Sequence, residues 1–358
     1  MGKRLINLGK EQLPLLLLGG ISLASLALIV FFAQAARQAL PNAQTTPPSQ
    51  TQLDSSTSEV FRLAMQPPEA RYELLKKLIE TESAASEQKS QDSYLARYLL
   101  ATDLLNQGNT AEALNLLNGQ EKKQDALTPY ALLKQGQAQL LTGESPASWN
   151  ELLANYDTHS ATAEARYELG KRDPSQWDAL LAKHPSHPRA VEVALQQLKT
   201  GTAKDKLLLV AAHGLYREEY EASLDRLTEE YGKELTPEEW ETIGFGYWEN
   251  QGYGKASQAY AKAPVSPRSL YRTARGAQIA RKKVVAIAAY QKLAKTYPNA
   301  PETGLGLIKL ADSLPDKAAL APLDQVIKTF PDRAGDALLK KANILEQLQN
   351  IGLFQEGV

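Results

Sequence analysis

The fold is decided by the stretch Thr236-Pro-Glu-Glu-Trp240-Glu-Thr-Ile-Gly-Phe-Gly-Tyr247-Trp-Glu-Asn-Gln-Gly252-Tyr-Gly-Lys-Ala-Ser-Gln-Ala-Tyr260-Ala-Lys-Ala263. Thr236 is a suitable helix N-cap, Pro237 suits the first helical position, and Glu239 completes a capping box, so a helix begins here. Gly252 then predicts a turn, and a second helix follows it. The stretch therefore predicts a helix–turn–helix unit.

The spacing of large and small residues predicts how these two helices pack. One face of the first helix carries Trp240, Ile243, Gly244 and Tyr247. One face of the second helix carries Ala256, Tyr260 and Ala263. Because Gly244 has no side chain, the second helix can approach closely. This pattern resembles the tetratricopeptide repeat. The resemblance implies an α-α solenoid, in which each helix pair is stabilised by its neighbours.

Weaker copies of the pattern lie on both sides, at residues 100–117, 135–152, 274–293 and 307–326. Two nearly identical phrases, Lys295-Thr-Tyr-Pro298 and Lys328-Thr-Phe-Pro331, close successive copies 33 residues apart, which is one less than the 34-residue period. Residues 190–231 predict helices whose pairing the pattern does not fix. We therefore expect an all-α, tetratricopeptide-like solenoid of about seven or eight helix pairs over residues 59–350.

An apolar segment precedes this array. Residues 15–32 carry no charge, and residues 13–36 have roughly the 20-residue length that crosses a bilayer. The cations Lys3, Arg4 and Lys10 in front of it predict that the N-terminus stays in the cytoplasm and the bulk is exported to a periplasm or other extracytoplasmic space. A cleaved signal sequence is the alternative, since Ala33-Gln-Ala35 is a possible cleavage site.

The domain organisation follows from these segments. We expect a cytoplasmic tail (residues 1–12), a transmembrane anchor or signal sequence (residues 13–36), a polar, proline-containing disordered linker (residues 37–58) and a tail (residues 351–358) around the solenoid. The helix predicted over residues 337–349 resembles the first helix of another repeat, so we expect the chain to be part of a longer protein. Together these features predict a single-pass membrane protein.

Composition excludes several kinds of site. The chain of 358 residues has no cysteine, which excludes disulfides and thiolate chemistry, and its net charge of −1 predicts no nucleic-acid partner. His184 and His187 lie in a proline-containing turn, and neither they nor the other two histidines form a metal-ligand pattern. We expect no catalytic residue, no cofactor and no metal.

The apolar segment in front of repeats that close with Tyr-Pro or Phe-Pro also resembles two kinds of bacterial protein. These are the helical superhelix of soluble lytic transglycosylases and the helical arrays of envelope-assembly proteins. The transglycosylase resemblance implies a general-acid glutamate followed by serine and a Gly-Leu-Met-Gln-like segment. Glu82-Ser83 and Glu144-Ser145 lack such a segment, so no catalytic residue is assigned.

Three functions follow as expectations. The first is a membrane-anchored, exported scaffold of the bacterial cell envelope that binds partners and has no catalysis of its own. The second is the non-catalytic superhelical portion of a peptidoglycan-cleaving enzyme whose catalytic domain is absent from this chain. The third, a soluble cytoplasmic adaptor, requires the export prediction to be wrong.

Charge is segregated along the chain. Residues 255–300 contain ten basic residues and no acid, whereas residues 217–249 contain eleven acids and three bases. Either neighbouring repeats of opposite sign stabilise each other, or a basic surface binds a partner protein, peptidoglycan or another anionic polymer. The candidate contact residues are Arg268, Tyr271, Arg272, Arg275, Arg281, Lys282 and Lys283.

Overall fold

The computed structural model describes residues 59–80, 87–118 and 126–356, and every regular element among them is a helix. The helices are α2 (Glu59–Ala64), α3 (Pro68–Glu80), α4 (Glu87–Asn106), α5 (Thr110–Leu117), α6 (Thr128–Leu141), α7 (Ala147–Asn155), α8 (Ser160–Gly170), α9 (Pro174–Lys183), α10 (Pro188–Gln197), α11 (Lys204–His213), α12 (Tyr220–Tyr231), α13 (Pro237–Glu249), α14 (Tyr253–Tyr260), α15 (Pro267–Ile279), α16 (Lys283–Thr296), α17 (Pro301–Ala311), α18 (Asp316–Thr329) and α19 (Pro331–Glu356). The predicted all-α class is confirmed for this part of the chain.

The chain divides into two compact units, residues 1–169 and 170–358, with the boundary at the end of α8. In the first unit, Arg71 of α3 forms a buried bidentate pair with Asp103 of α4, with nitrogen–oxygen distances of 2.7 and 2.5 Å. The same guanidinium donates to the carbonyl oxygens of Ala64 and Gln66. Because both charges are buried and hydrogen-bonded, the pair fixes how α2, α3 and α4 meet.

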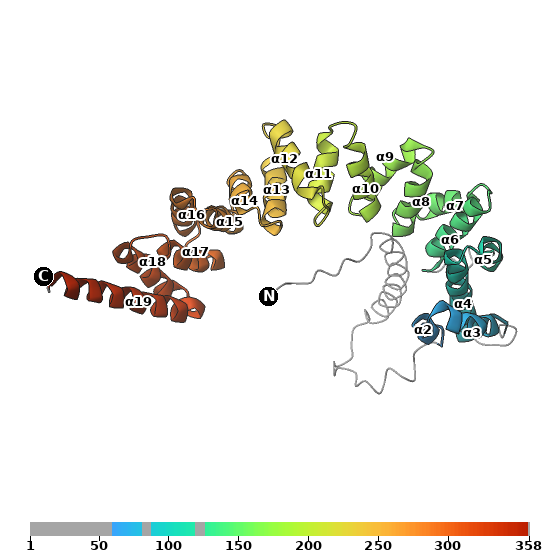
Figure 1. The fold of residues 1–358 in the computed structure, drawn as a ribbon, viewed down its shortest axis with the longest axis horizontal. Helices are drawn as coiled ribbons and strands as arrows, with labels where there is room; N and C mark the ends of the chain where they lie inside the picture. Colours follow the sequence, from blue (N-terminus) through green and yellow to red (C-terminus); the bar gives the residue numbers. More distant parts are fainter. Residues whose placement is uncertain (1–58, 81–86, 119–125, 357–358) are drawn as a thin grey trace, which may run out of the picture. The chain divides into compact units, whose positions relative to one another are not determined.

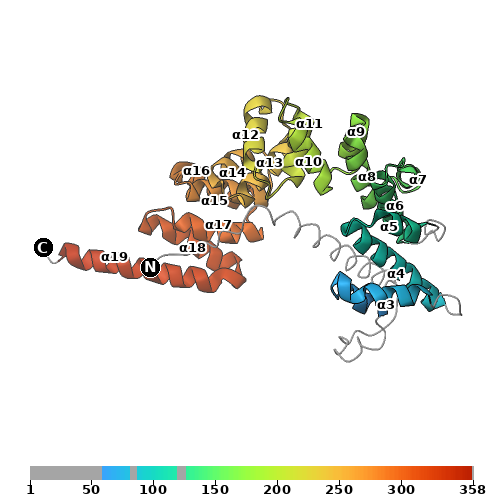
Figure 2. The ribbon, with the colours of Figure 1, turned by 45° about the vertical axis from the view of Figure 1, so that its right-hand side comes forward.

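The second unit is a two-layered array of helix pairs (Figures 1 and 2). Each helix from α13 to α19 packs on the next in sequence, and the odd-numbered helices also contact one another: α11 with α13, α15 with α17, and α17 with α19. The odd-numbered helices therefore form one layer and the even-numbered helices the other. This is the nearest-neighbour arrangement that the repeat pattern predicts.

The capping and packing predicted for residues 236–263 are confirmed. The Thr236 hydroxyl accepts a hydrogen bond from the backbone N–H of Glu239, whose carboxylate accepts one from the backbone N–H of Thr236. A Cβ atom at Gly244 would lie 3.0 Å from the ring of Tyr260. The missing side chain is thus what lets α14 pack closely on α13.

Two boundaries differ from the sequence-based expectation. The eighteen helices of the described residues would make nine pairs, one or two more than expected, and α10, α11 and α12 account for residues 190–231, whose pairing the sequence left open. The last helix, α19, continues to Glu356 and so enters residues 351–358, which the sequence predicts to be a tail.

The predicted single-pass membrane location is contradicted. Within residues 59–80, 87–118 and 126–356, no helix combines the length and the apolar character that a bilayer span requires. The helices of sufficient length, α4 and α19, carry charged residues throughout. The expected anchor (residues 13–36), its preceding tail (residues 1–12) and the linker (residues 37–58) lie outside the described residues.

Close packing of small residues gives a first prediction. A Cβ atom at Gly246 of α13 would lie 2.3 Å from the hydroxyl oxygen of Tyr220, which donates a hydrogen bond to the carbonyl oxygen of Ala211 at 2.8 Å. Gly246→Ala should therefore lower the free energy of unfolding by about 1–3 kcal/mol, measured by urea denaturation.

The matched control is Gly335→Ala in α19, where an added Cβ meets nothing within 4 Å. That change should be neutral or stabilising by about 0.5–1 kcal/mol, because alanine favours a helix interior. Equal effects of the two substitutions would show that the close contact with Tyr220 does not limit packing.

Buried tyrosines predict sensitivity to alkali. Burial, with a smaller contribution from the charge of Glu249, raises the pKa of Tyr220 to about 12, and burial raises the pKa of Tyr98, Tyr247 and Tyr290 still further. The folded state thus favours the protonated phenols. Their stabilising contribution is complete below about pH 10, the unfolded pKa, and is lost as pH rises through the folded values. The last part of the tyrosinate absorbance, which comes from these buried phenols, should therefore appear only together with loss of helical circular dichroism. Complete ionisation of all fifteen tyrosines with helicity intact would contradict this.

Candidate partner-binding surface

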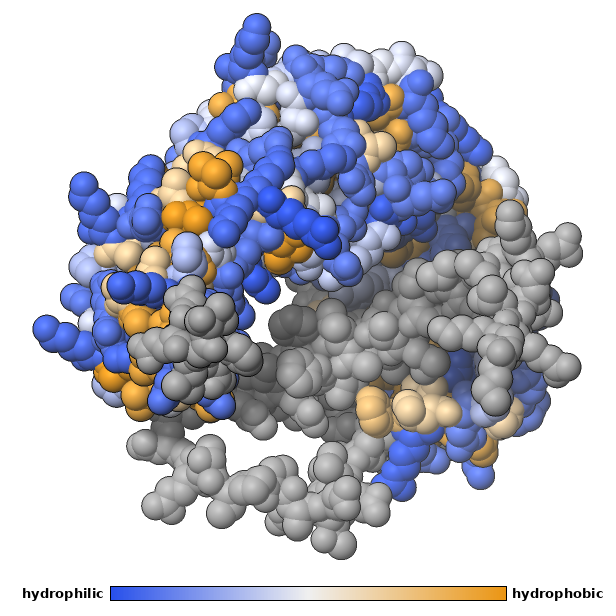
Figure 3. Space-filling view, turned by 60° about the vertical axis from the view of Figure 1, so that its left-hand side comes forward, coloured by the Kyte–Doolittle hydropathy of each residue, from blue (hydrophilic) through white to orange (hydrophobic). Residues whose placement is uncertain are grey.

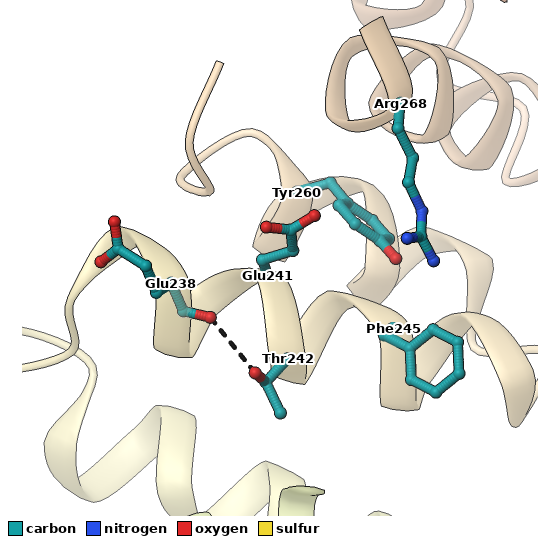
Figure 4. Close-up of a pocket in the computed structure, with 6 residues that line it drawn as sticks. All are labelled: Glu238, Glu241, Thr242, Phe245, Tyr260 and Arg268. Carbon is teal, nitrogen blue, oxygen red and sulfur yellow. Dashed lines mark hydrogen bonds between the residues drawn. The ribbon is translucent and has the colours of Figure 1, made fainter. Parts of the chain in front are cut away.

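An open groove lies along the second unit between α13 and α15 (Figure 4). Its volume is about 460 Å³, and its lining residues are Glu238, Glu241, Thr242 and Phe245 of α13, Tyr260 of α14 and Arg268 of α15. Phe245 is 37% exposed. Figure 4 shows the guanidinium of Arg268 reaching down from α15 toward the hydroxyl of Tyr260. The groove therefore combines an aromatic surface with charged groups.

The charged groups of the groove have opposite signs on opposite sides. Glu238 and Glu241 supply carboxylates from α13, and Arg268 supplies a guanidinium from α15. No ion pair within the described residues involves any of these three side chains. Burial raises the pKa of Tyr260. Its hydroxyl, at the groove floor, can donate or accept a hydrogen bond.

Arg272, a predicted contact residue, makes contacts within the chain. Its guanidinium carbon lies 4.6 Å from the ring centroid of Trp248, its Nη1 donates to the hydroxyl of Tyr260 at 3.3 Å, and it pairs with Glu249 at 3.8 Å. The side chain is only 19% exposed. Arg272 therefore joins α15 to α13 and α14.

Arg275 and Tyr271 are also occupied within the array. Arg275 donates to the amide oxygen of Gln278 at 2.6 Å, and the amide nitrogen of Gln278 donates to the carbonyl oxygen of Lys309. Tyr271 packs on Tyr290 of α16, with ring centroids 6.3 Å apart. These contacts tie α15 to its neighbours α16 and α17, so both residues stabilise the stacking.

Arg281, Lys282 and Lys283 lie elsewhere, at the turn between α15 and α16, where all three are exposed. Arg268 stands in the first turn of α15, and Arg281 follows the end of that helix. At about 1.5 Å per residue, roughly 20 Å of helix separates them. The seven predicted residues thus do not form one surface, and the structure brings only Arg268 into the groove.

Phe245, Glu238 and Glu241 line the groove but are not among the predicted contact residues, although the position of Phe245 in the repeat could have pointed to them. Phe245 stands between Gly244 and Gly246, off the face that carries the repeat pattern, and so points away from the paired helix. A large aromatic residue on that side of a first repeat helix has no packing role within its own pair. Glu238 and Glu241 lie on the same side of α13 (Figure 4).

The opposite charges of neighbouring segments are partly used to hold helices together. Lys255 of α14 pairs with Asp225 at 2.8 Å and Glu221 at 3.0 Å on α12, and the hydrogen bond to Asp225 is the main cause of its raised pKa. The ammonium of Lys262 lies 3.8 Å from the ring centroid of Trp240. For Lys255, mutual stabilisation of neighbouring repeats accounts for the charge pattern, whereas Lys262 contacts an aromatic ring of its own helix pair.

The described residues contain no group of three or more His, Asp or Glu side chains placed to hold a metal ion. His187 is instead the N-cap of α10, where its ring accepts a hydrogen bond from the backbone N–H of Arg189, and His184 is the C-cap of α9. The proline-containing turn predicted for these histidines is thus confirmed.

Removal of the Arg272 guanidinium gives a prediction about stability. Arg272→Lys keeps a charge for Glu249 but loses the planar group that lies over Trp248 and bonds Tyr260. The free energy of unfolding should fall by about 0.5–2 kcal/mol. The control is Arg268→Lys, one turn earlier and exposed, which should change it by less than about 0.5 kcal/mol. Equal losses of unfolding free energy in both variants would contradict the role of Arg272 in joining α15 to α13 and α14.

No protein-family model and no curated protein matches the chain. Among solved structures, the chain is similar to the C-terminal part of a TPR repeat-containing protein from Cytophaga hutchinsonii, with 18% identity and a TM-score of 0.35. The match covers 67% of this chain and 99% of that chain. The described helices of this chain are tetratricopeptide-like in arrangement, and the resemblance to lytic transglycosylases is not shown.

Proposed function

We propose that this chain is a helical-repeat scaffold that binds a segment of a partner protein in the groove between α13 and α15, and that it acts by binding without catalysing a reaction. The observation that carries the proposal is the composition of the groove. An exposed aromatic residue, two acidic residues and one arginine line the same open space, and no ion pair of the described residues involves Glu238, Glu241 or Arg268.

The array supplies the rigidity that such a site needs. Tyr260, at the groove floor, is buried and fixed by its contacts with Gly244 and Arg272. The positions of α13, α14 and α15 are therefore set before a partner arrives, so binding does not require the groove to be ordered first. A site carried by rigid helices is more exact than one carried by loops.

The groove chemistry defines its occupant. The groove would be matched by a segment with three features. These are an apolar side chain over Phe245, a cation near Glu238 and Glu241, and a carboxylate near Arg268. Peptidoglycan or another anionic polymer would place negative charge beside the acidic residues of α13. Like charges at that distance repel, which favours a protein segment carrying both signs.

A direct test uses peptides selected from a random displayed library against the wild-type chain. Selected peptides should combine an acid, an apolar residue and a base. Arg268→Glu and Phe245→Ala should each weaken their binding about 10- to 100-fold, since both remove a central contact. Binding would be measured by fluorescence anisotropy.

The control is Lys292→Glu, the same charge reversal on an exposed position of α16 outside the groove. It should leave peptide affinity unchanged. Loss of binding in the Lys292 variant equal to that in the Arg268 variant would mean that net charge, and not the groove, determines affinity. The proposal would be overturned if the affinity of the selected peptides were unchanged by both groove substitutions.

A further inference from the structure

The turn between α15 and α16 carries an exposed surface that is both basic and apolar. We call it the basic tip, and its residues are Ile279, Arg281, Lys282, Lys283, Val284 and Val285. Val284 is 81% exposed, Val285 46% and Ile279 40%. No ion pair or hydrogen bond of the described residues involves the charged groups of the three cations. The tip is separate from the α13–α15 groove.

Three successive residues of the tip are locally unfavourable for the fold. Arg281 adopts a left-handed backbone with φ of 60°, as Tyr216 and Gln251 do at other turns of the second unit, whereas Gly108 and Gly143 hold the positive-φ position at turns of the first unit. Lys282 is the N-cap of α16 without a side-chain capping bond. Lys283 places a cation at the positive end of the helix dipole. The charged groups of these three residues are exposed, so they are available to a partner outside the chain.

A second exposed apolar surface lies on α19, the helix that runs past α18 in Figures 1 and 2. We call it the α19 outer face, and its residues are Asp332, Asp336, Leu338, Leu339, Ala342, Leu345 and Glu346. Leu339 is 67% exposed, Leu338 52% and Leu345 45%. At 100° per residue these side chains occupy the half of the helix opposite Ala337 and Ile344, which pack into the core.

The charge of the α19 outer face is negative. Its two neighbouring cations are turned to the other side of the helix, where Lys340 pairs with Asp312 and Lys341 pairs with Asp324. Asp332, Asp336 and Glu346 remain exposed. Figure 3, which brings this end of the chain forward, shows hydrophobic patches set among hydrophilic residues. The α19 outer face therefore presents leucines bordered by acids. It is complementary to the basic tip, which presents valines and an isoleucine bordered by cations.

We propose that the basic tip of one copy of this chain docks on the α19 outer face of a second copy. Charge selects this pairing over the two symmetric ones. Two tips would bring six cations together, and two outer faces would bring acids together with no free cation between them. Only the unlike pairing brings opposite charges together while covering apolar side chains on both surfaces.

Such a contact joins different surfaces of the two copies, so a dimer keeps one free face on the copy that supplied its tip and one free tip on the other copy. Association therefore continues beyond a dimer, into a ring if the geometry closes and into an open chain if it does not. The few residues involved make it a weak interface. Average mass should rise between about 10 µM and 1 mM protein and fall again in high salt, which screens the charges.

The test measures mass by light scattering at increasing concentration for two charge-reversed variants. Lys282→Glu/Lys283→Glu makes the tip acidic, and Asp336→Lys/Glu346→Lys makes the outer face basic. Each variant alone should remain monomeric, because tip and face then have the same sign. Mixing the two should restore association, because every tip again finds a face of opposite sign.

Misfolding is excluded by design. Glutamates at the start of α16 suit the helix dipole, so the tip variant should melt no lower than the wild type. Arg281→Gly relieves the left-handed strain and should leave the melting temperature unchanged or higher while weakening association. The matched control, Lys292→Glu/Lys295→Glu, reverses two exposed charges of α16 outside the tip and should associate as the wild type does.

Three results would overturn the proposal. The wild type could remain monomeric throughout the concentration range, which would leave both surfaces for other occupants. Association could persist in the tip variant, which would mean that outer faces pair with each other. Lastly, the mixture of variants could stay monomeric while the wild type associates, which would place the contact elsewhere.

Discussion

The array depends on one packing constraint: a large aromatic side chain of one helix must fit against a small residue of the helix beside it. Tyr260 lies against Gly244, and Tyr220 lies against Gly246. In the first unit, the fully buried Trp149 lies against Gly136 in the same way. An added methyl group at these glycines would separate the helices, and closely packed interiors absorb such changes poorly.

Polar atoms of the aromatic residues reinforce the same contacts. The hydroxyl of Tyr220 donates to the carbonyl oxygen of Ala211, and the indole N–H of Trp149 donates to that of Leu133. A buried hydroxyl or N–H without an acceptor costs free energy, so these bonds fix the rotation of each helix as well as its distance. The exposed side of α13 is thereby held in a defined orientation, and the groove residues are carried with it.

The role of each cation depends on where it lies in the stack of helices. Cations that reach an acid or an aromatic ring on a neighbouring helix, such as Lys255, Lys262 and Arg272, stabilise the stack. Cations at helix ends and turns, such as Arg268 and Lys283, find no such partner within the described residues. This division separates residues that build the array from residues available for binding.

The sequence by itself determined the helical class, the capping box at Thr236 and the tight contact at Gly244, because each depends on residues close together in the chain. It predicted a single basic contact surface and a membrane location. The membrane location is contradicted. The tertiary structure places the predicted cations in three different settings: contacts between helices, the groove, and the turn between α15 and α16. Which side chains share a surface depends on how successive helices stack, and no local pattern encodes the direction in which Arg272 or Arg268 finally points.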